Sequence, residues 1–95
     1  MSFQSIINKV KDFHIIYVRP YSEILTLISN PELRHSLMAE ENDEYLEAAK
    51  KKDLTGIADA LGDMLYILCG TIIEHGMQHV IEEVFDEIHR SNLSK

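Results

Sequence analysis

The sequence predicts an all-α protein, a helical bundle of four to five helices that is completed by oligomerisation. Three observations support this fold class. Apolar residues recur at helical spacing along most of the chain, helix-capping residues stand at the junctions between these stretches, and no segment alternates with the period of a strand. The 95 residues suffice for one compact domain, so we expect a single domain over residues 1–95 without linker or repeat.

The first predicted helix is marked by Ile6, Val10, Phe13 and Tyr17 at helical spacing. It should run from about residue 2 to residue 17, because the Arg19-Pro20 pair that follows cannot continue a helix. The next stretch, residues 21–29, is short and apolar. Its sequence is compatible with either a brief helix or a packed connection.

The second predicted helix begins at Asn30-Pro31-Glu32, which combines a capping amide, a proline at the first helical position and an acid at the positive dipole end. This helix should continue to about Lys52, with the cations of residues 50–52 near the negative dipole end. Asp53 is placed to cap the helix that follows.

The third predicted helix, from Leu54 to about Glu74, is apolar on nearly every side and should therefore be central. His75-Gly76 gives it a suitable end, and a last helix is expected from about Gln78 to His89. Three short neighbours cannot cover such a helix in a chain of this length. We therefore expect at least a homodimer, with a homotetramer as the alternative.

Charge and cysteine content exclude several functional classes. A formal net charge of -7 argues against a nucleic-acid binder, which needs clustered cations. The single cysteine, Cys69, cannot form an internal disulfide, and no signal pattern stands at the N-terminus. The longest apolar stretch carries Asp59 and Asp63, which disfavour a membrane span. These features indicate a cytoplasmic protein.

Two acidic groups are candidates for chemistry. Glu40, Glu41 and Glu44 share one face of the second helix, because residues three or four apart lie side by side. Taken alone, this group is more typical of a solvated acidic surface than of a metal site. Asp59 and Asp63 lie one turn apart in the apolar third helix, and we expect them to be shielded from solvent and to need a metal or another partner.

A tight turn at Asp53 would bring these two groups together. In an antiparallel pair, Glu44 lies level with Asp63, and Glu41 lies one turn further along. Several carboxylates facing one another form an oxygen site that suits Mg²⁺, or alternatively Mn²⁺, better than Zn²⁺.

The sequence resembles the all-α nucleoside triphosphate pyrophosphatases, and within them the MazG-like, phosphoribosyl-ATP-pyrophosphohydrolase-like branch. The resemblance covers nearly the whole chain and depends on the order and spacing of several short motifs. These are Val10-x-x-Phe13-His14, Leu33-Arg34, Glu40-Glu41-x-x-Glu44, Ile57-Ala58-Asp59-Ala60-Leu61-Gly62-Asp63-x-x-Tyr66, Gly70-Thr71, His75-Gly76, residues 84–92 and Ser94-Lys95.

The resemblance implies a magnesium site and a nucleotide substrate. Glu41, Glu44 and Asp63 match the family's metal ligands, whereas the expected glutamate of its Glu-x-x-Asp motif falls on Ala60. Asp59 is the substitute that we assign to this ligand position. The catalytic role of positioning or deprotonating the attacking water is assigned to Glu40, with Glu41 as the alternative. The substrate-binding candidates are Arg90, Asn92, Lys95, Lys51 and Tyr66.

The expected activity is Mg²⁺-dependent cleavage of nucleoside triphosphates between the α and β phosphates, which releases a monophosphate and pyrophosphate and serves to clean the nucleotide pool. Two alternatives remain open. One is a non-catalytic, nucleotide-binding helical oligomer whose metal site is degraded at Ala60. The other is phosphoribosyl-ATP hydrolysis.

Overall fold

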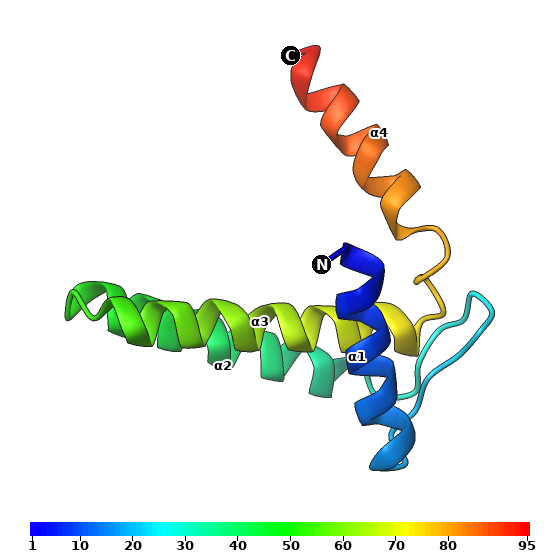
Figure 1. The fold of residues 1–95 in the computed structure, drawn as a ribbon, viewed down its shortest axis with the longest axis horizontal. Coiled ribbons are helices and arrows are strands. Elements are labelled where there is room, and N and C mark those ends of the chain that lie inside the picture. Colours follow the sequence, from blue (N-terminus) through cyan, green and yellow to red (C-terminus); the bar gives the residue numbers. More distant parts are fainter.

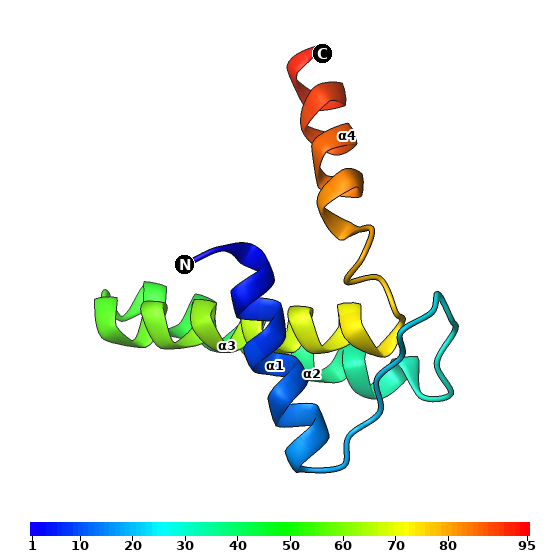
Figure 2. The same cartoon turned by 45° about the vertical axis from the view of Figure 1, so that its right-hand side comes forward.

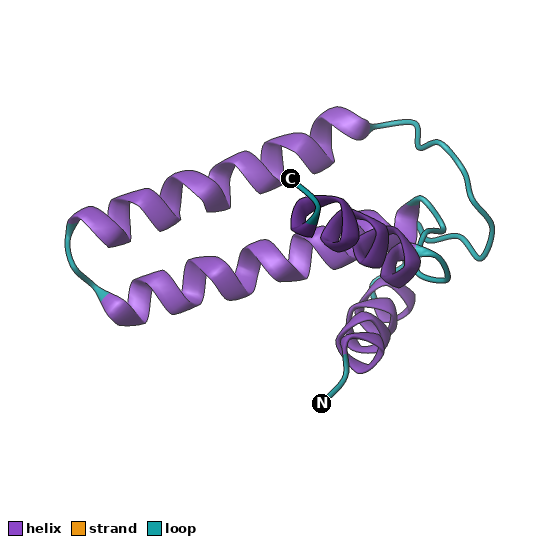
Figure 3. Ribbon diagram, turned by 90° about the horizontal axis from the view of Figure 1, so that it is seen from above, coloured by secondary structure: helices purple, strands orange, loops and turns teal.

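A computed structural model describes all 95 residues and confirms the all-helical fold. The chain forms four helices and no strand: α1 (Phe3–Ile16), α2 (Pro31–Lys50), α3 (Leu54–Glu74) and α4 (Ile81–Leu93). Helices α2 and α3 run antiparallel as a long hairpin (Figure 3). Helix α1 crosses the C-terminal half of α3, and α4 projects away from the other three (Figures 1 and 2).

The predicted starts of α1, α2 and α3 are confirmed by side-chain caps. Ser2, Asn30 and Asp53 each accept a hydrogen bond from the backbone N–H three residues ahead, at the beginning of α1, α2 and α3. Gly76 follows α3 with a φ of 68°, and a Cβ at this position would overlap the carbonyl oxygen of Ile24. Only glycine can therefore end α3 against the segment that precedes α2.

The open question about residues 21–29 is resolved against a helix: they form a connection held by backbone hydrogen bonds, while Ile24, Leu25 and Leu27 stay largely exposed. Ser22 N–H donates to the carbonyl of Ile73 at 2.9 Å, and Thr26 N–H donates to that of His75 at 3.0 Å, so the segment is tied to the end of α3. The last helix begins and ends later than predicted, at Ile81 and Leu93. Gln78 lies before it in a turn, because its buried side chain donates to the Ser22 carbonyl at 2.7 Å.

The core is small and lies between α1 and the C-terminal half of α3. Its buried side chains are Ile7, Val10, Cys69 and Ile73. Helix α2 has no buried residue at all. The fully buried core therefore lies between α1 and α3, whereas the apolar residues of α2 are only partly buried.

By length and composition α3 could cross a membrane, with a mean hydropathy of 1.5 over its apolar window. The central helix of a soluble protein passes the same test. Here α3 lies against both α1 and α2 and carries two aspartates in its first three turns.

Candidate metal centre

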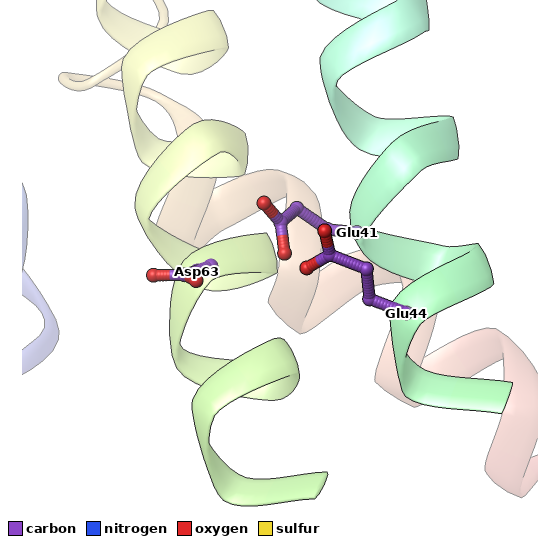
Figure 4. A group of neighbouring side chains, drawn as sticks. All are labelled: Glu41, Glu44 and Asp63. Carbon is purple, nitrogen blue, oxygen red and sulfur yellow. The ribbon is translucent and has the colours of Figure 1, made fainter. Parts of the chain in front are cut away.

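Three of the predicted ligands meet between α2 and α3. Glu41, Glu44 and Asp63 each offer a carboxylate oxygen, and these oxygens lie within 4.8 Å of one another. Glu41 and Glu44 extend from α2 towards α3, where Asp63 lies (Figure 4). The antiparallel register that the sequence predicted from the turn at Asp53 is thereby confirmed.

Glu41 is the electrostatically strained member of this triad. Partial burial raises the pKa of its carboxyl from 4.5 to about 7, helped by the close approach and negative charge of Glu44 and by the charges of Asp63 and Glu40. Its Oε2 atom is buried and has no hydrogen-bond partner. A buried carboxylate oxygen without a partner is costly, so Glu41 calls for a proton or a cation.

The donor set fits a hard divalent cation. All three groups are carboxylates, no lysine or arginine forms an ion pair with any of them, and the Oε2 atom of Glu41 lacks the partner that an ion would supply. Oxygen donors of this kind suit Mg²⁺ or Mn²⁺, which keep water molecules in their remaining coordination positions.

Asp59 does not join the triad. It is exposed and lines a neighbouring pocket of about 230 Å³ between α2 and α3, together with Glu44 and the buried Ala60. The expectation that Asp59 and Asp63 are shielded from solvent is wrong for the single chain, because α1 covers only the other half of α3 and leaves both aspartates exposed. A ligand role for Asp59 remains a prediction.

Of the predicted phosphate-binding cations, only Lys51 lies beside the triad. It lines the same pocket as Glu44, and its Nζ pairs with Glu47 at 2.8 Å. Arg90 pairs within its own helix with Glu87, and Lys95 donates to Asn92 at 3.0 Å. These three C-terminal candidates belong to the end of the chain that projects away from the α2–α3 hairpin (Figure 1).

Glu40 and Tyr66 flank the triad without joining it. Glu40 is exposed beside Glu41 on α2. Tyr66 is also partly exposed and packs edge to face against Phe13 of α1, with 5.6 Å between ring centroids. The aromatic contact accounts for the position of Tyr66, and a role of either residue towards substrate stays a prediction.

A buried ion pair near the triad escaped the sequence analysis. Arg34 of α2 pairs with Glu74 of α3 at 2.9 Å, and their side chains are only 14% and 10% exposed. The sequence showed that α3 contains no cation, but it gave no sign that an arginine from another helix would reach Glu74. Only the motif residues Leu33-Arg34 and Gly70-Thr71 pointed to this region.

The comparison with protein families gives one match. The model of the family described as phosphoribosyl-ATP pyrophosphohydrolase matches residues 19–92, which include the whole of α2 and α3 and every residue of the triad. A search among curated proteins finds no match.

Proposed function

Because the chain belongs to the phosphoribosyl-ATP pyrophosphohydrolase family, we propose that it hydrolyses the α–β phosphoanhydride bond of nucleotides with the help of Mg²⁺. The family is one of soluble hydrolases that act on phosphoric anhydrides and are typically metal-dependent. The observation that carries the proposal is the triad of Glu41, Glu44 and Asp63 with its unpartnered buried oxygen.

Each residue of the site has a distinct task in this proposal. Glu41, Glu44 and Asp63 hold the cation, which when bound neutralises phosphate charge and lowers the pKa of water. Glu40 lies beside the triad and orients or deprotonates the attacking water, with Glu41 as the alternative base. Asp59 contributes a further carboxylate ligand to the cation from the adjoining pocket. Lys51 binds a phosphate group there once its ion pair with Glu47 is broken. Tyr66 borders the nucleotide.

Two substrate classes are consistent with this chemistry. Our leading proposal is nucleoside triphosphates, cleaved to monophosphate and pyrophosphate as a house-cleaning reaction in the cytoplasm. The family match favours a second candidate, phosphoribosyl-ATP, which is cleaved at the same bond. The purified protein should be assayed against all common NTPs and dNTPs and against phosphoribosyl-ATP, with separate detection of pyrophosphate and phosphate.

The outcome of that assay is decisive. A nucleoside monophosphate with pyrophosphate supports the proposal, and the preferred substrate chooses between the two classes. A nucleoside diphosphate with phosphate contradicts it. Nucleotide binding without any turnover supports the rival reading, a non-catalytic oligomer that lost a ligand at Ala60.

We further propose that the working enzyme is a homo-oligomer, either a dimer or a tetramer. The chain exposes 7034 Å², whereas a compact monomer of its 10.9 kDa mass exposes about 5,600 Å². The excess of about 1,400 Å² is the area that one subunit of a permanent homodimer typically contributes to its interface. The radius of gyration, 14.8 Å, likewise exceeds the value of about 12.4 Å for a compact chain of this length.

The surface proposed for this contact is an apolar groove of about 630 Å³ between α4, α3 and the start of α1. Its apolar lining consists of Phe3, Leu68, Ile72, Ile81, Val84, Phe85 and Ile88. Such a patch is seldom left open in a soluble monomer, and a second copy of the chain supplies a matching amphipathic α4. In such an assembly Arg90, Asn92 and Lys95 are available to the substrate of a neighbouring subunit.

A further inference from the structure

Arg34 is the most extensively bonded side chain between α2 and α3. Its Nη1 pairs with the Glu74 carboxylate at 2.9 Å, its Nε donates to Thr71 Oγ1 at 3.0 Å, and its Nη2 donates to the carbonyl oxygen of Ile67 at 2.9 Å. These three partners span two turns of α3 on one face. A planar guanidinium with donors pointing in fixed directions therefore sets the rotation of α2 as well as its distance from α3.

The surroundings of Arg34 are built to accept this side chain. A Cβ at Gly70 would lie only 2.6 Å from Arg34 Nη2 and 3.0 Å from Nε2 of the buried His14, so a side chain at residue 70 would displace the guanidinium from this position. His14 is held in turn by a 2.8 Å hydrogen bond between its Nδ1 and the Pro20 carbonyl oxygen. The guanidinium thus lies against α3 at a position that Gly70 leaves free, and the His14 ring of α1 borders the same position.

Apolar packing between α2 and α3 is incomplete, because the apolar side chains of α2, among them Leu37 and Met38, are only partly buried. At the closed end of the hairpin, the turn around Asp53 joins the helices. At the open end, Arg34 is the residue that forms an ion pair between α2 and α3. The three carboxylates of the triad lie between these two attachments and repel one another.

The contacts of Arg34 and the triad depend on the same alignment of α2 along α3. Glu41 lies seven residues after Arg34, which is two turns along the same face of α2, and Asp63 lies eight residues before Thr71 on α3. A slip of one helical turn moves a residue by about 5.4 Å. This shift exceeds the 4.8 Å within which the triad oxygens gather.

We infer that Arg34 is a positioning residue for the metal centre: its contacts with Glu74, Thr71 and Ile67 hold α2 against α3 so that the triad is assembled before the cation binds. This inference rests on the proposed function. Loss of a group that orients metal ligands typically lowers metal affinity by about 10- to 100-fold. Substitution of Arg34 should therefore weaken cation binding although Arg34 is not a ligand.

The test measures Mn²⁺ affinity directly, by electron paramagnetic resonance of free Mn²⁺, in wild type, Arg34→Met and Thr71→Val. Thr71→Val keeps the side-chain shape and the Arg34–Glu74 ion pair and removes the hydroxyl that accepts from Arg34 Nε. It therefore tests the inference even if Arg34→Met does not fold. The matched control is Val10→Ala, which opens a small void in the α1–α3 core and leaves Arg34 and its three partners unchanged.

We expect Arg34→Met to raise the Kd for Mn²⁺ by about tenfold or more and Thr71→Val to raise it by a smaller factor. Val10→Ala should lower the melting temperature and leave the Kd unchanged. Wild-type Mn²⁺ affinity in both hairpin variants would overturn the inference, whatever their stability. Equal weakening of Mn²⁺ binding in Val10→Ala would also overturn the inference, because a general loss of stability would then explain the lower affinity.

Hydrogen exchange of the metal-free protein separates this inference from the proposed function. If Arg34 holds the hairpin, Arg34→Met should lose amide protection along α2 relative to Val10→Ala, and unchanged protection there contradicts the inference. Failure of wild type itself to bind Mn²⁺ contradicts the proposed metal centre instead.

Discussion

Truncation of Phe85 to alanine should dissociate the proposed oligomer. The Phe85 side chain is 66% exposed in the single chain and lines the apolar groove of α4. An aromatic side chain buries about 150–250 Å² when fully covered, so about 130 Å² remains to be covered by a partner. At about 25 cal/mol per Å², this corresponds to about 3 kcal/mol per subunit.

A two-fold interface contains Phe85 twice, so the substitution should cost about 6 kcal/mol per dimer, or a change of about ten-thousandfold or more in the dissociation constant. Sedimentation velocity over nanomolar to micromolar concentrations should show wild type as an oligomer and Phe85→Ala as a folded monomer. The control is Leu27→Ala, which removes a side chain that is 90% exposed in the connection before α2. A monomeric wild type, or equal association in all three proteins, would refute the reasoning.

Three further predictions concern the metal centre. Because burial and neighbouring charges raise the pKa of Glu41 to about 7 from 4.5, the folded protein binds this proton more tightly than the unfolded chain does. The metal-free protein should therefore lose stability as the pH rises from about 4.5 to 7. The stabilisation by Mg²⁺ should grow over the same pH range. Thermal melts that show the opposite trends contradict the assignment of the raised pKa to Glu41. Asp59→Asn should weaken Mn²⁺ binding if Asp59 is a ligand, and an unchanged Kd with reduced turnover would instead indicate a role in the pocket beside Ala60. Ala60→Glu places a fourth carboxylate at the buried floor of that pocket and should lower the Kd for Mn²⁺ severalfold; weaker binding would show that the pocket cannot admit the side chain.

Helix content and register were predictable from the sequence because their determinants are local. Asn30 and Asp53 indicate helix starts because their side chains can cap the first backbone N–H groups, and both caps are observed. The turn at Asp53 then fixes which acids of α2 face which acids of α3. The encounter of Glu41 and Glu44 with Asp63 follows from counting residues on either side of that turn.

The start of the last helix was less predictable because it depends on distant contacts. Residues 78–80 include no proline or glycine that would stop a helix. The Gln78 side chain nevertheless donates a hydrogen bond to the carbonyl of Ser22, which is 56 residues away in the sequence. The Arg34–Glu74 pair is similarly non-local. A sequence shows the charges of such residues but not which of them lie opposite each other.

The exposure of Asp59 and Asp63 shows a second limit. The apolar composition of α3 suggested that both acids are buried, but a single chain has too few helices to cover this end of α3. Composition reports how much surface a helix needs to bury. It does not report whether the covering surface comes from the same chain or from another copy.

The most direct test of the central claim compares wild type with Asp63→Asn, which keeps the size of the side chain and removes its charge. Both proteins are melted with and without Mg²⁺ and assayed for pyrophosphate release from their best substrate. We expect Mg²⁺ to stabilise wild type and not the variant, and turnover of the variant to fall by at least about a hundredfold, since the cation is needed to activate water and to bind phosphate. Equal responses to Mg²⁺ and equal turnover in the two proteins would contradict the assignment of Glu41, Glu44 and Asp63 as the metal centre.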